Sequence, residues 1–123
     1  MEAGARQAQA APLRQYELWW ARLAEPAGRR PVLLLQRNGA AEYLNHLLVA
    51  EITTQIRGIP QELALGKREG LDRRSVANFD SMRLVSKERL ASRIGSLHPS
   101  REVELKRAVG SVFGWPELDQ LED

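Results

Sequence analysis

A run of four apolar residues, VLLL at 32–35, limits the folds open to this chain more than any other feature of its sequence. A strand with one face in water alternates polar and apolar side chains, whereas an uninterrupted apolar run indicates burial on both faces. We therefore expect residues 31–36 to form a strand that is covered on each side. Pro31 suits the start of such a strand, because proline has no amide hydrogen to give to the ladder.

Four further strands are expected from apolar, aromatic and β-branched runs bounded by turn residues. They are residues 17–23, 47–54, 61–65 and 75–85. In the first of them, ELWWARL, alternation directs Trp19 and Trp20 to opposite sides. One ring is then expected in the core and the other on a second surface, such as a groove or a subunit interface. Partial cover of both rings by the domain itself is the alternative.

Two helices are expected after the strands. A short one would run from an N-cap at Ser86 to a stop at Gly95 and carry Leu90 and Ile94. A longer one should begin at Pro99, whose fixed φ suits a first helical turn. Apolar side chains recur at helical spacing along it, at Leu105, Ala108, Val109, Val112 and Phe113. The chain has too few helical crossovers for a parallel sheet, so the expected fold class is α+β with a strongly curved, mostly antiparallel sheet.

A length of 123 residues predicts a single domain. We expect that domain at 14–116, between a flexible tail at 1–13 and an acidic tail, ELDQLED, at 117–123. The net charge of +2 hides a more basic body, because this last segment has four acids and no base. A basic body suits a polyanionic partner, although many basic proteins bind no nucleic acid. No apolar run approaches the length of a membrane span, and the N-terminus lacks the hydrophobic centre of a secretory signal, so a cytoplasmic location is expected.

Several kinds of active site find no support in the residue types. Cysteine is absent, which excludes thiol catalysis and thiolate metal sites. His46 and His98 have no carboxylates at metal-ligand spacing, and His98, which precedes Pro99, is more simply a capping or surface residue. Glu51 and Asp80 are two isolated acids and weak evidence for magnesium. No phosphate-binding or serine-hydrolase motif is present. We expect neither a metal nor a cofactor.

What remains is a set of arginines, hydroxyls and amides. Arg30 lies where the chain enters the buried strand, and Thr53 and Thr54 end the strand at 47–54. Because side chains alternate, only one of the two threonines faces the same side as Glu51. Taken alone, Arg30 is more simply a surface charge at a strand end, and threonine is common in strands because it is β-branched.

The motifs nevertheless occur in a familiar order: ELWWARL, then EPAGRRPVLLLQR, then LLVAEITTQIRGIPQELAL, then GLDRRSVANFDSMRLVSKERLASRIGSL. In this order they resemble the MazF/PemK family of toxins from type II toxin–antitoxin systems, over roughly residues 14–114. The resemblance implies a small SH3-like barrel of mostly antiparallel strands with a C-terminal helix, the plasmid-maintenance toxin fold shared with CcdB. It also implies a homodimer and an endoribonuclease, an mRNA interferase, that cuts single-stranded RNA at short sequences without a metal.

Within that family, the arginine before the strand-two proline and the threonine that ends strand three are the catalytic pair, which here implies Arg30 and Thr53. The chemistry is coherent, because the RNA 2′-hydroxyl can attack the adjacent phosphorus and give a 2′,3′-cyclic phosphate and a 5′-hydroxyl. Arg30 would then stabilise the developing phosphorane oxygens, while Thr53 adds a hydrogen bond. An arginine is a poor general base, so the base is left open, with Glu51 and Asp80 as candidates.

Groove contacts follow from positions in the same motifs. Base contacts are expected from Gln55, Asn78 and Ser81, and phosphate contacts from Arg14 and Arg57. Arg29 is interpreted as a surface or phosphate-steering charge. The acidic C-terminal segment of a cognate MazE-like antitoxin is expected to compete with RNA for this groove.

The sequence departs from the family pattern in two places. Many relatives have glycine where this chain has Tyr16, and the link at 24–29 between the first two strands is short. Both departures concern loop contacts and RNA preference more than catalysis. Two alternative functions stay open, a non-catalytic CcdB-like toxin that binds DNA gyrase and an inactive SH3-like binding module.

Overall fold

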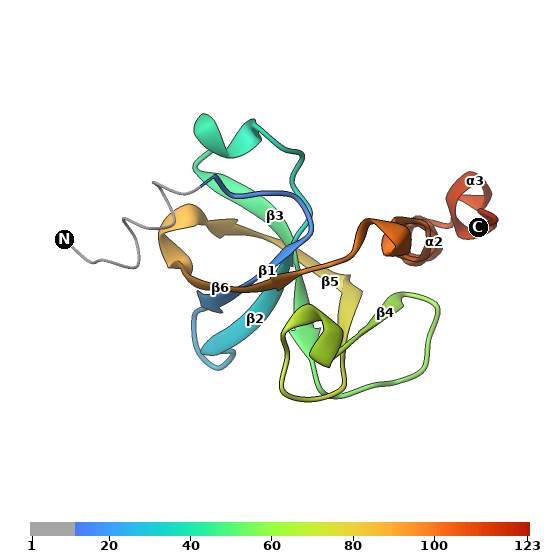
Figure 1. The fold of residues 1–123 in the computed structure, drawn as a ribbon, viewed down its shortest axis with the longest axis horizontal. Coiled ribbons are helices and arrows are strands. Elements are labelled where there is room, and N and C mark those ends of the chain that lie inside the picture. Colours follow the sequence, from blue (N-terminus) through green and yellow to red (C-terminus); the bar gives the residue numbers. More distant parts are fainter. Residues whose placement is uncertain (1–11) are drawn as a thin grey trace.

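The computed structural model describes residues 12–123, in which six strands form one sheet of order β4–β5–β3–β2–β1–β6. Every neighbouring pair in that order is antiparallel. The sheet curls strongly, and the C-terminal helices lie beside it (Figure 1). The strands are β1 (Glu17–Arg22), β2 (Arg29–Leu34), β3 (His46–Thr53), β4 (Glu62–Leu65), β5 (Ser75–Ser86) and β6 (Leu90–Ser96). The expected α+β fold, a curled antiparallel sheet with a C-terminal helix, is confirmed.

The apolar run in β2 is buried on both faces, as its pattern predicts. Val32, Leu33 and Leu34 are each at most 1% exposed, and β2 lies between β1 and β3 in the sheet. Leu33 packs into one hydrophobic cluster, and Val32 and Leu34 pack into another on the opposite face. Full burial of one such side chain contributes about 1.5–3 kcal/mol, so β2 ties the two clusters into one stable unit.

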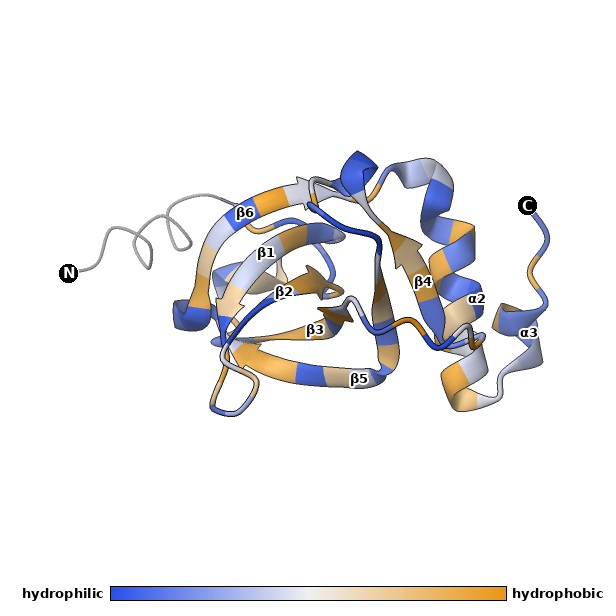
Figure 2. Ribbon diagram, turned by 90° about the horizontal axis from the view of Figure 1, so that it is seen from below, coloured by the Kyte–Doolittle hydropathy of each residue, from blue (hydrophilic) through white to orange (hydrophobic). Residues whose placement is uncertain are grey.

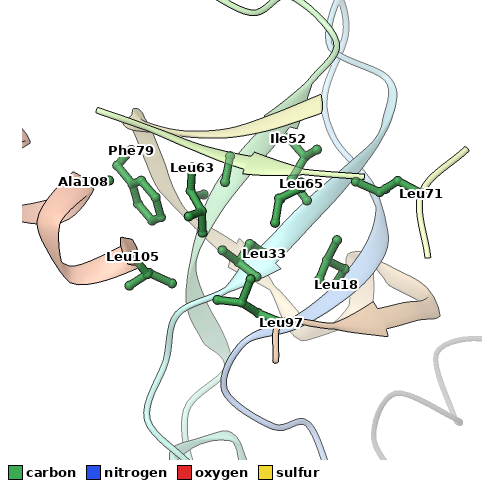
Figure 3. Close-up of a cluster of buried hydrophobic side chains, with 12 residues drawn as sticks. Leu18, Leu33, Ile52, Leu63, Leu65, Leu71, Phe79, Leu97, Leu105 and Ala108 are labelled. Atoms are coloured by element: carbon green, nitrogen blue, oxygen red, sulfur yellow. The ribbon is translucent and has the colours of Figure 1, made fainter. Parts of the chain in front are cut away.

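We call the first cluster the helix-side core, because it includes residues of the C-terminal helix. Leucines from β1, β2 and β4 meet Phe79 of β5 there, and Leu105 and Ala108 of the helix close it (Figure 3). The second cluster, the far core, contains Trp19, which is 4% exposed. Leu13 also belongs to the far core and is 8% exposed. Of the segment expected as a flexible N-terminal tail, residues 1–11 lie outside the described part of the chain.

Helix α2 (Glu102–Phe113) begins where the sequence predicts, after a 3₁₀ turn at Pro99–Arg101. His98 caps this turn, since its side chain accepts a hydrogen bond of 3.1 Å from the Ser100 amide. The helix lies along β4, outside the curled sheet (Figure 2). Phe113 is 51% exposed and stacks on Trp115 at 4.5 Å between ring centroids, so it is not part of the buried face expected from its spacing.

A short helix, α3 (Pro116–Asp119), folds back on α2. Gly110 makes this possible, because a Cβ at that position would lie 2.5 Å from the Asp119 amide nitrogen. The helix-weakening glycine is therefore explained by close packing. Arg107 fixes the last residues through a hydrogen bond of 2.8 Å to the Leu121 carbonyl and an ion pair of 3.1 Å to Asp123. The acidic segment at 117–123 thus makes defined contacts with α2.

The expected short helix between Ser86 and Gly95 is wrong, because most of this segment is strand β6. Ser86 does act as a cap, but of a 3₁₀ turn, η3 (Lys87–Arg89), where its side chain accepts from the Glu88 amide. The chain then pairs with β1 along almost its whole length, with two register shifts. Leu90 and Ile94 have helical spacing by chance. Backbone pairing with β1, which would otherwise be a sheet edge, outweighs the weak local helix signal.

The gap between the two edge strands is closed by a 3₁₀ turn, η2 (Lys67–Glu69), which follows β4 and packs on β6. Contact is so close that a Cβ at Gly95 would collide with the Glu69 carbonyl. The Glu69 carboxylate is 4% exposed and accepts hydrogen bonds from the Gly66 amide at 2.6 Å and from Arg101 at 3.3 Å. We call this η2–β6 contact the seam. Within residues 12–123, none of the helices has the length and apolar character needed to span a membrane.

Candidate active site

A cavity of about 660 Å³ lies where β2 begins and β3 ends. The segment that joins η2 to β5 forms another part of its wall. The residues that line it are Trp20, Arg29, Arg30, Pro31, Ile52, Thr53, Thr54, Gln55, Gly70, Leu71, Asp72, Arg73 and Ser75. Its size is that of a small-molecule or single-nucleotide site.

Arg30 and Thr53 both line this cavity. The β2–β3 register pairs Val32 with Glu51, and continuing it by two residues in the antiparallel sense places Arg30 opposite Thr53. Directly opposite residues of an antiparallel pair project to the same side of the sheet. The two side chains are therefore brought together from positions that are far apart in the sequence.

The Arg30 guanidinium has unused hydrogen-bonding capacity. Its Nε is buried and has no hydrogen-bond partner among the described residues. Its Nη1 donates to the Ile52 carbonyl at 3.5 Å, a long hydrogen bond. The Arg30 side chain as a whole is 32% exposed, so part of its guanidinium remains accessible to an oxyanion in the cavity.

Glu51 links Arg30 to a second arginine. One Glu51 oxygen lies 3.9 Å from Arg30 Nε, and the other accepts a hydrogen bond of 3.0 Å from Arg83 on β5. As alternation predicts, Glu51 is on the same side as Thr53. The carboxylate thus balances two cations and orients the Arg30 guanidinium from behind.

Thr53 is held by the turn that ends β3. Its hydroxyl oxygen accepts a hydrogen bond of 3.1 Å from the Gln55 amide. This contact uses the hydroxyl as an acceptor and leaves its hydrogen to be donated to a ligand. Gln55, one of the residues expected to contact RNA, also lines the cavity.

The other four residues expected to contact RNA are not among those that line the cavity. Arg14 is exposed, and its amide donates to Glu17. Arg57 lies on an exposed loop held by hydrogen bonds from its amide to the Glu62 carboxylate. Asn78 is 8% exposed and its side chain accepts from the Asp80 amide, a local turn contact. Ser81 is half-buried, in the part of β5 where the register with β3 shifts.

Three polar residues of the wall were not predicted from the sequence as site residues: Asp72, Arg73 and Ser75. They lie on the chain that leaves the seam at Gly70, whose φ of 98° ends η2. Glycine in this left-handed conformation redirects the chain without strain. The sequence GLDRRS at 70–75 does indicate a loop, because a glycine followed by charged residues of both signs is typical of loops that present polar side chains.

The two candidates for a general base are placed differently. Glu51 is committed to Arg30 and Arg83, and Asp80 is not among the cavity residues. Asp72 is the one carboxylate in that lining. Among residues 12–123, histidine and carboxylate side chains form no group of three suited to a metal ion.

The two adjacent tryptophans face opposite sides, as alternation predicts. Trp19 is buried in the far core, whereas Trp20 is half-buried and lines the cavity. The Arg29 guanidinium lies over the Trp20 ring, with its carbon 3.9 Å from the ring centroid. Arg29 is therefore an exposed charge that also stacks on Trp20.

A curled antiparallel sheet with a C-terminal helix is the fold of the class of small toxins that includes MazF. The family model described as the PemK-like, MazF-like toxin of type II toxin–antitoxin systems matches residues 14–113, and the chain belongs to this family.

Among relatives, the chain is 44% identical over 82 residues to the probable endoribonuclease MazF5 of Mycobacterium tuberculosis, which covers 66% of this chain and 74% of that protein. Among solved structures, it is similar to the Mycobacterium tuberculosis toxin MazF-mt6, with a TM-score of 0.75 and 33% identity over 80% of this chain and 96% of that one. An endoribonuclease in complex with its cognate antitoxin, from a mycobacterial species, superposes with a TM-score of 0.74 and 25% identity, covering 86% of this chain and 98% of that one.

Proposed function

We propose that this chain is the toxin of a type II toxin–antitoxin pair and acts as a sequence-specific endoribonuclease on single-stranded RNA in the cytoplasm. The observation that carries this proposal is that Arg30 and Thr53 lie opposite each other on neighbouring strands and both line a cavity of nucleotide size. Family membership and relatives named as endoribonucleases support it.

The reaction uses the substrate's own nucleophile. The RNA 2′-oxygen attacks the adjacent phosphorus, the bond from phosphorus to the 5′-oxygen breaks, and the products are a 2′,3′-cyclic phosphate and a 5′-hydroxyl. DNA has no 2′-hydroxyl and is not cut. No metal is required by this scheme, because the protein has only to position the groups and stabilise charge.

Each cavity residue has a role in this scheme. Arg30 donates hydrogen bonds to the phosphorane oxygens and to the leaving 5′-oxygen, which takes its final proton from solvent. Thr53 donates one further hydrogen bond to the phosphate. Asp72 accepts the proton of the 2′-hydroxyl, because it is the carboxylate of the cavity lining. Glu51 is a positioning residue that orients Arg30.

The partners follow from the same surface. The arginines of the cavity, Arg29, Arg30 and Arg73, bind the phosphates of RNA and also suit the acidic segment of a MazE-like antitoxin. The family also implies a homodimer, which is consistent with two apolar side chains in solvent. Leu48 and Leu84 are cross-strand partners on β3 and β5 and are 36% and 63% exposed.

The test incubates pure protein with defined RNAs in EDTA and maps the ends that are formed. Arg30→Ala and Thr53→Ala should each lower kcat by about a hundredfold or more, and Asp72→Asn by about a hundredfold to ten-thousandfold. Arg37→Ala, an exposed arginine outside the cavity, is the matched control and should cleave at the wild-type rate.

The outcomes separate the alternatives. Wild-type protein that arrests growth but leaves every RNA intact would favour a CcdB-like toxin that acts by binding. Cleavage at the wild-type rate by Arg30→Ala and Thr53→Ala would refute this site and leave the activity standing. DNA of the same sequence should remain intact throughout.

A further inference from the structure

Trp20 and Arg29 form a stacked pair on the wall of the cavity. The Arg29 guanidinium carbon is 3.9 Å from the centroid of the Trp20 ring, and both residues line the cavity. Neighbouring strands hold the pair in register, with Trp20 opposite Pro31 and Arg29 opposite Arg22. Neither side chain takes part in the proposed chemical step, and phosphate binding uses the charge of Arg29 but not its stacking on Trp20. The pair therefore calls for a role of its own.

The lining around the pair has two chemical characters. Trp20 and Pro31, both half-buried, give it apolar surface, and the exposed Thr54 and Gln55 give it uncharged hydrogen-bonding groups. A phosphate needs only cations and donors, so the apolar part of the wall is not explained by phosphate binding. A flat ligand with apolar faces and a polar edge fits both characters at once, and a nucleobase is such a ligand.

We propose that Trp20 and Arg29 form a nucleobase subsite, in which one base of single-stranded RNA stacks on the pair beside the scissile phosphate. The proposal rests on the proposed function, since it takes RNA as the ligand. Bases stack both on aromatic rings and on the planar guanidinium of arginine. Because every base has such a face, the stack holds the strand, and the amide of Gln55 and the hydroxyl of Thr54 read the edge of the base. Arg29 thereby acts through its plane as well as through its charge.

The subsite is tested by binding, so that the result does not depend on cleavage. The probes are 2′-O-methyl oligonucleotides, in which the nucleophile is blocked, with the sequence of the best-cleaved RNA. If no RNA is cleaved, the tightest binder from a random pool of the same length replaces it. A series of probes has one abasic nucleotide at each position in turn, and fluorescence anisotropy gives Kd for each probe.

For the wild-type protein, one abasic position should weaken binding by about 5- to 150-fold, the range expected for one stacked base. In Trp20→Leu the full-length probe should bind more weakly, and the same abasic position should cause little further loss. Arg29→Lys keeps the charge and removes the plane, so it should weaken binding in the same non-additive way. The matched controls are Trp115→Leu and Arg22→Lys, which are outside the cavity lining and should retain the full abasic effect.

Each outcome decides the proposal. Additive effects of the abasic position and of Arg29→Lys would overturn it, and because Arg29 is an exposed residue this variant remains informative even if Trp20→Leu fails to fold. Wild-type binding that ignores every abasic position, together with tight binding of an acidic peptide that Trp20→Leu abolishes, would overturn it in favour of a protein ligand. If the wild-type protein cleaves RNA but the abasic position and Arg29→Lys weaken binding additively, the subsite is rejected and the proposed function stands. If the protein cleaves no RNA but the two changes weaken binding non-additively, the nuclease function is rejected and the base-binding subsite stands.

Discussion

At the scale of single residues, the most informative contact is the one that Glu51 makes with two arginines. Arg83 holds Glu51 at 3.0 Å, and Glu51 in turn lies 3.9 Å from Arg30 Nε. The carboxylate is held from one side, so it fixes the orientation of the guanidinium on the other. Preorganised groups of this kind lower the cost of ordering the site during reaction.

We therefore expect Glu51→Gln to lower kcat about tenfold to a hundredfold with little change in KM, because misplacing a catalytic group has costs of that order. Arg83→Met should behave similarly, and Arg83→Lys should restore part of the loss by supplying a cation to Glu51. Steady-state kinetics on a short RNA separates the effect on kcat from the effect on KM, and Arg22→Met is the control. A Glu51→Gln enzyme that cleaves faster than the wild type would show that Glu51 restrains Arg30 instead of positioning it.

A second residue of note is Tyr16, at a position where the resemblance to the family implies glycine in many members. Its φ of 73° lies in the left-handed region, a conformation that favours glycine. Its hydroxyl donates to Glu102 on α2 at 2.9 Å and so ties the start of β1 to the helix. Burial, followed by this hydrogen bond and the charge of Glu102, raises the pKa of Tyr16 to about 12.

This raised pKa predicts a defined alkaline transition. The neutral phenol is the form favoured by folding, so its stabilising effect is complete below about pH 10, the ordinary pKa of tyrosine, and is lost as the pH rises toward about 12. In a Tyr43→Phe background, absorbance of the phenolate should rise with a midpoint near 12. Glu102→Gln should lower the midpoint only partly, since burial is the larger cause. A midpoint at the ordinary value would contradict the observed packing of Tyr16.

At the scale of elements, the seam between η2 and β6 depends on a missing side chain. Gly95→Ala would place a methyl group against the Glu69 carbonyl, so backbone must move. We expect a loss of about 1–3 kcal/mol in the free energy of unfolding, the usual cost of overpacking, measured by urea denaturation. Gly66→Ala is the control, because a Cβ there meets nothing within 4 Å and its φ of −176° is ordinary extended backbone. Equal stability of the two variants would show that the seam opens at little cost.

The elements also show how far the sequence was informative. The strand at 31–36 and the helix after Pro99 were predictable, because their hydrophobic patterns are long or unambiguous. Strand β6 was not, since Leu90 and Ile94 have helical spacing and only pairing with β1 decides the matter. Arg30 and Thr53 were predicted from the resemblance to the family, and both line the cavity. Asp72 was not predicted, because it reaches the cavity only through the path of the chain after the seam.

At the scale of the whole molecule, the sheet leaves one apolar pair uncovered. Leu48 and Leu84 lie opposite each other on adjacent strands, and Leu84 is 63% exposed. Such surface is typical of a subunit interface. We expect Leu84→Asp to convert the proposed homodimer to a monomer without unfolding it. Light scattering coupled to size-exclusion chromatography measures the mass, with Leu118→Asp, on the half-buried α3 surface, as a control for a general effect of a new charge. A dimer that survives Leu84→Asp would place the interface elsewhere.

The seam has one more consequence, for attempts to redesign the RNA preference of this protein. The chain at 70–74 is a wall of the cavity, yet Glu69 is anchored to Arg101 just before it and β5 begins at Ser75 just after it. One end of this short span is fixed by the seam, and the other by the pairing of Ser75 with Leu65 on β4. Loops of another length cannot be grafted here without reopening the sheet, so variation is confined to side-chain exchange at constant length. Libraries that randomise only the exposed positions 72–74, and keep Gly70 and the buried Leu71, are the ones compatible with the fold.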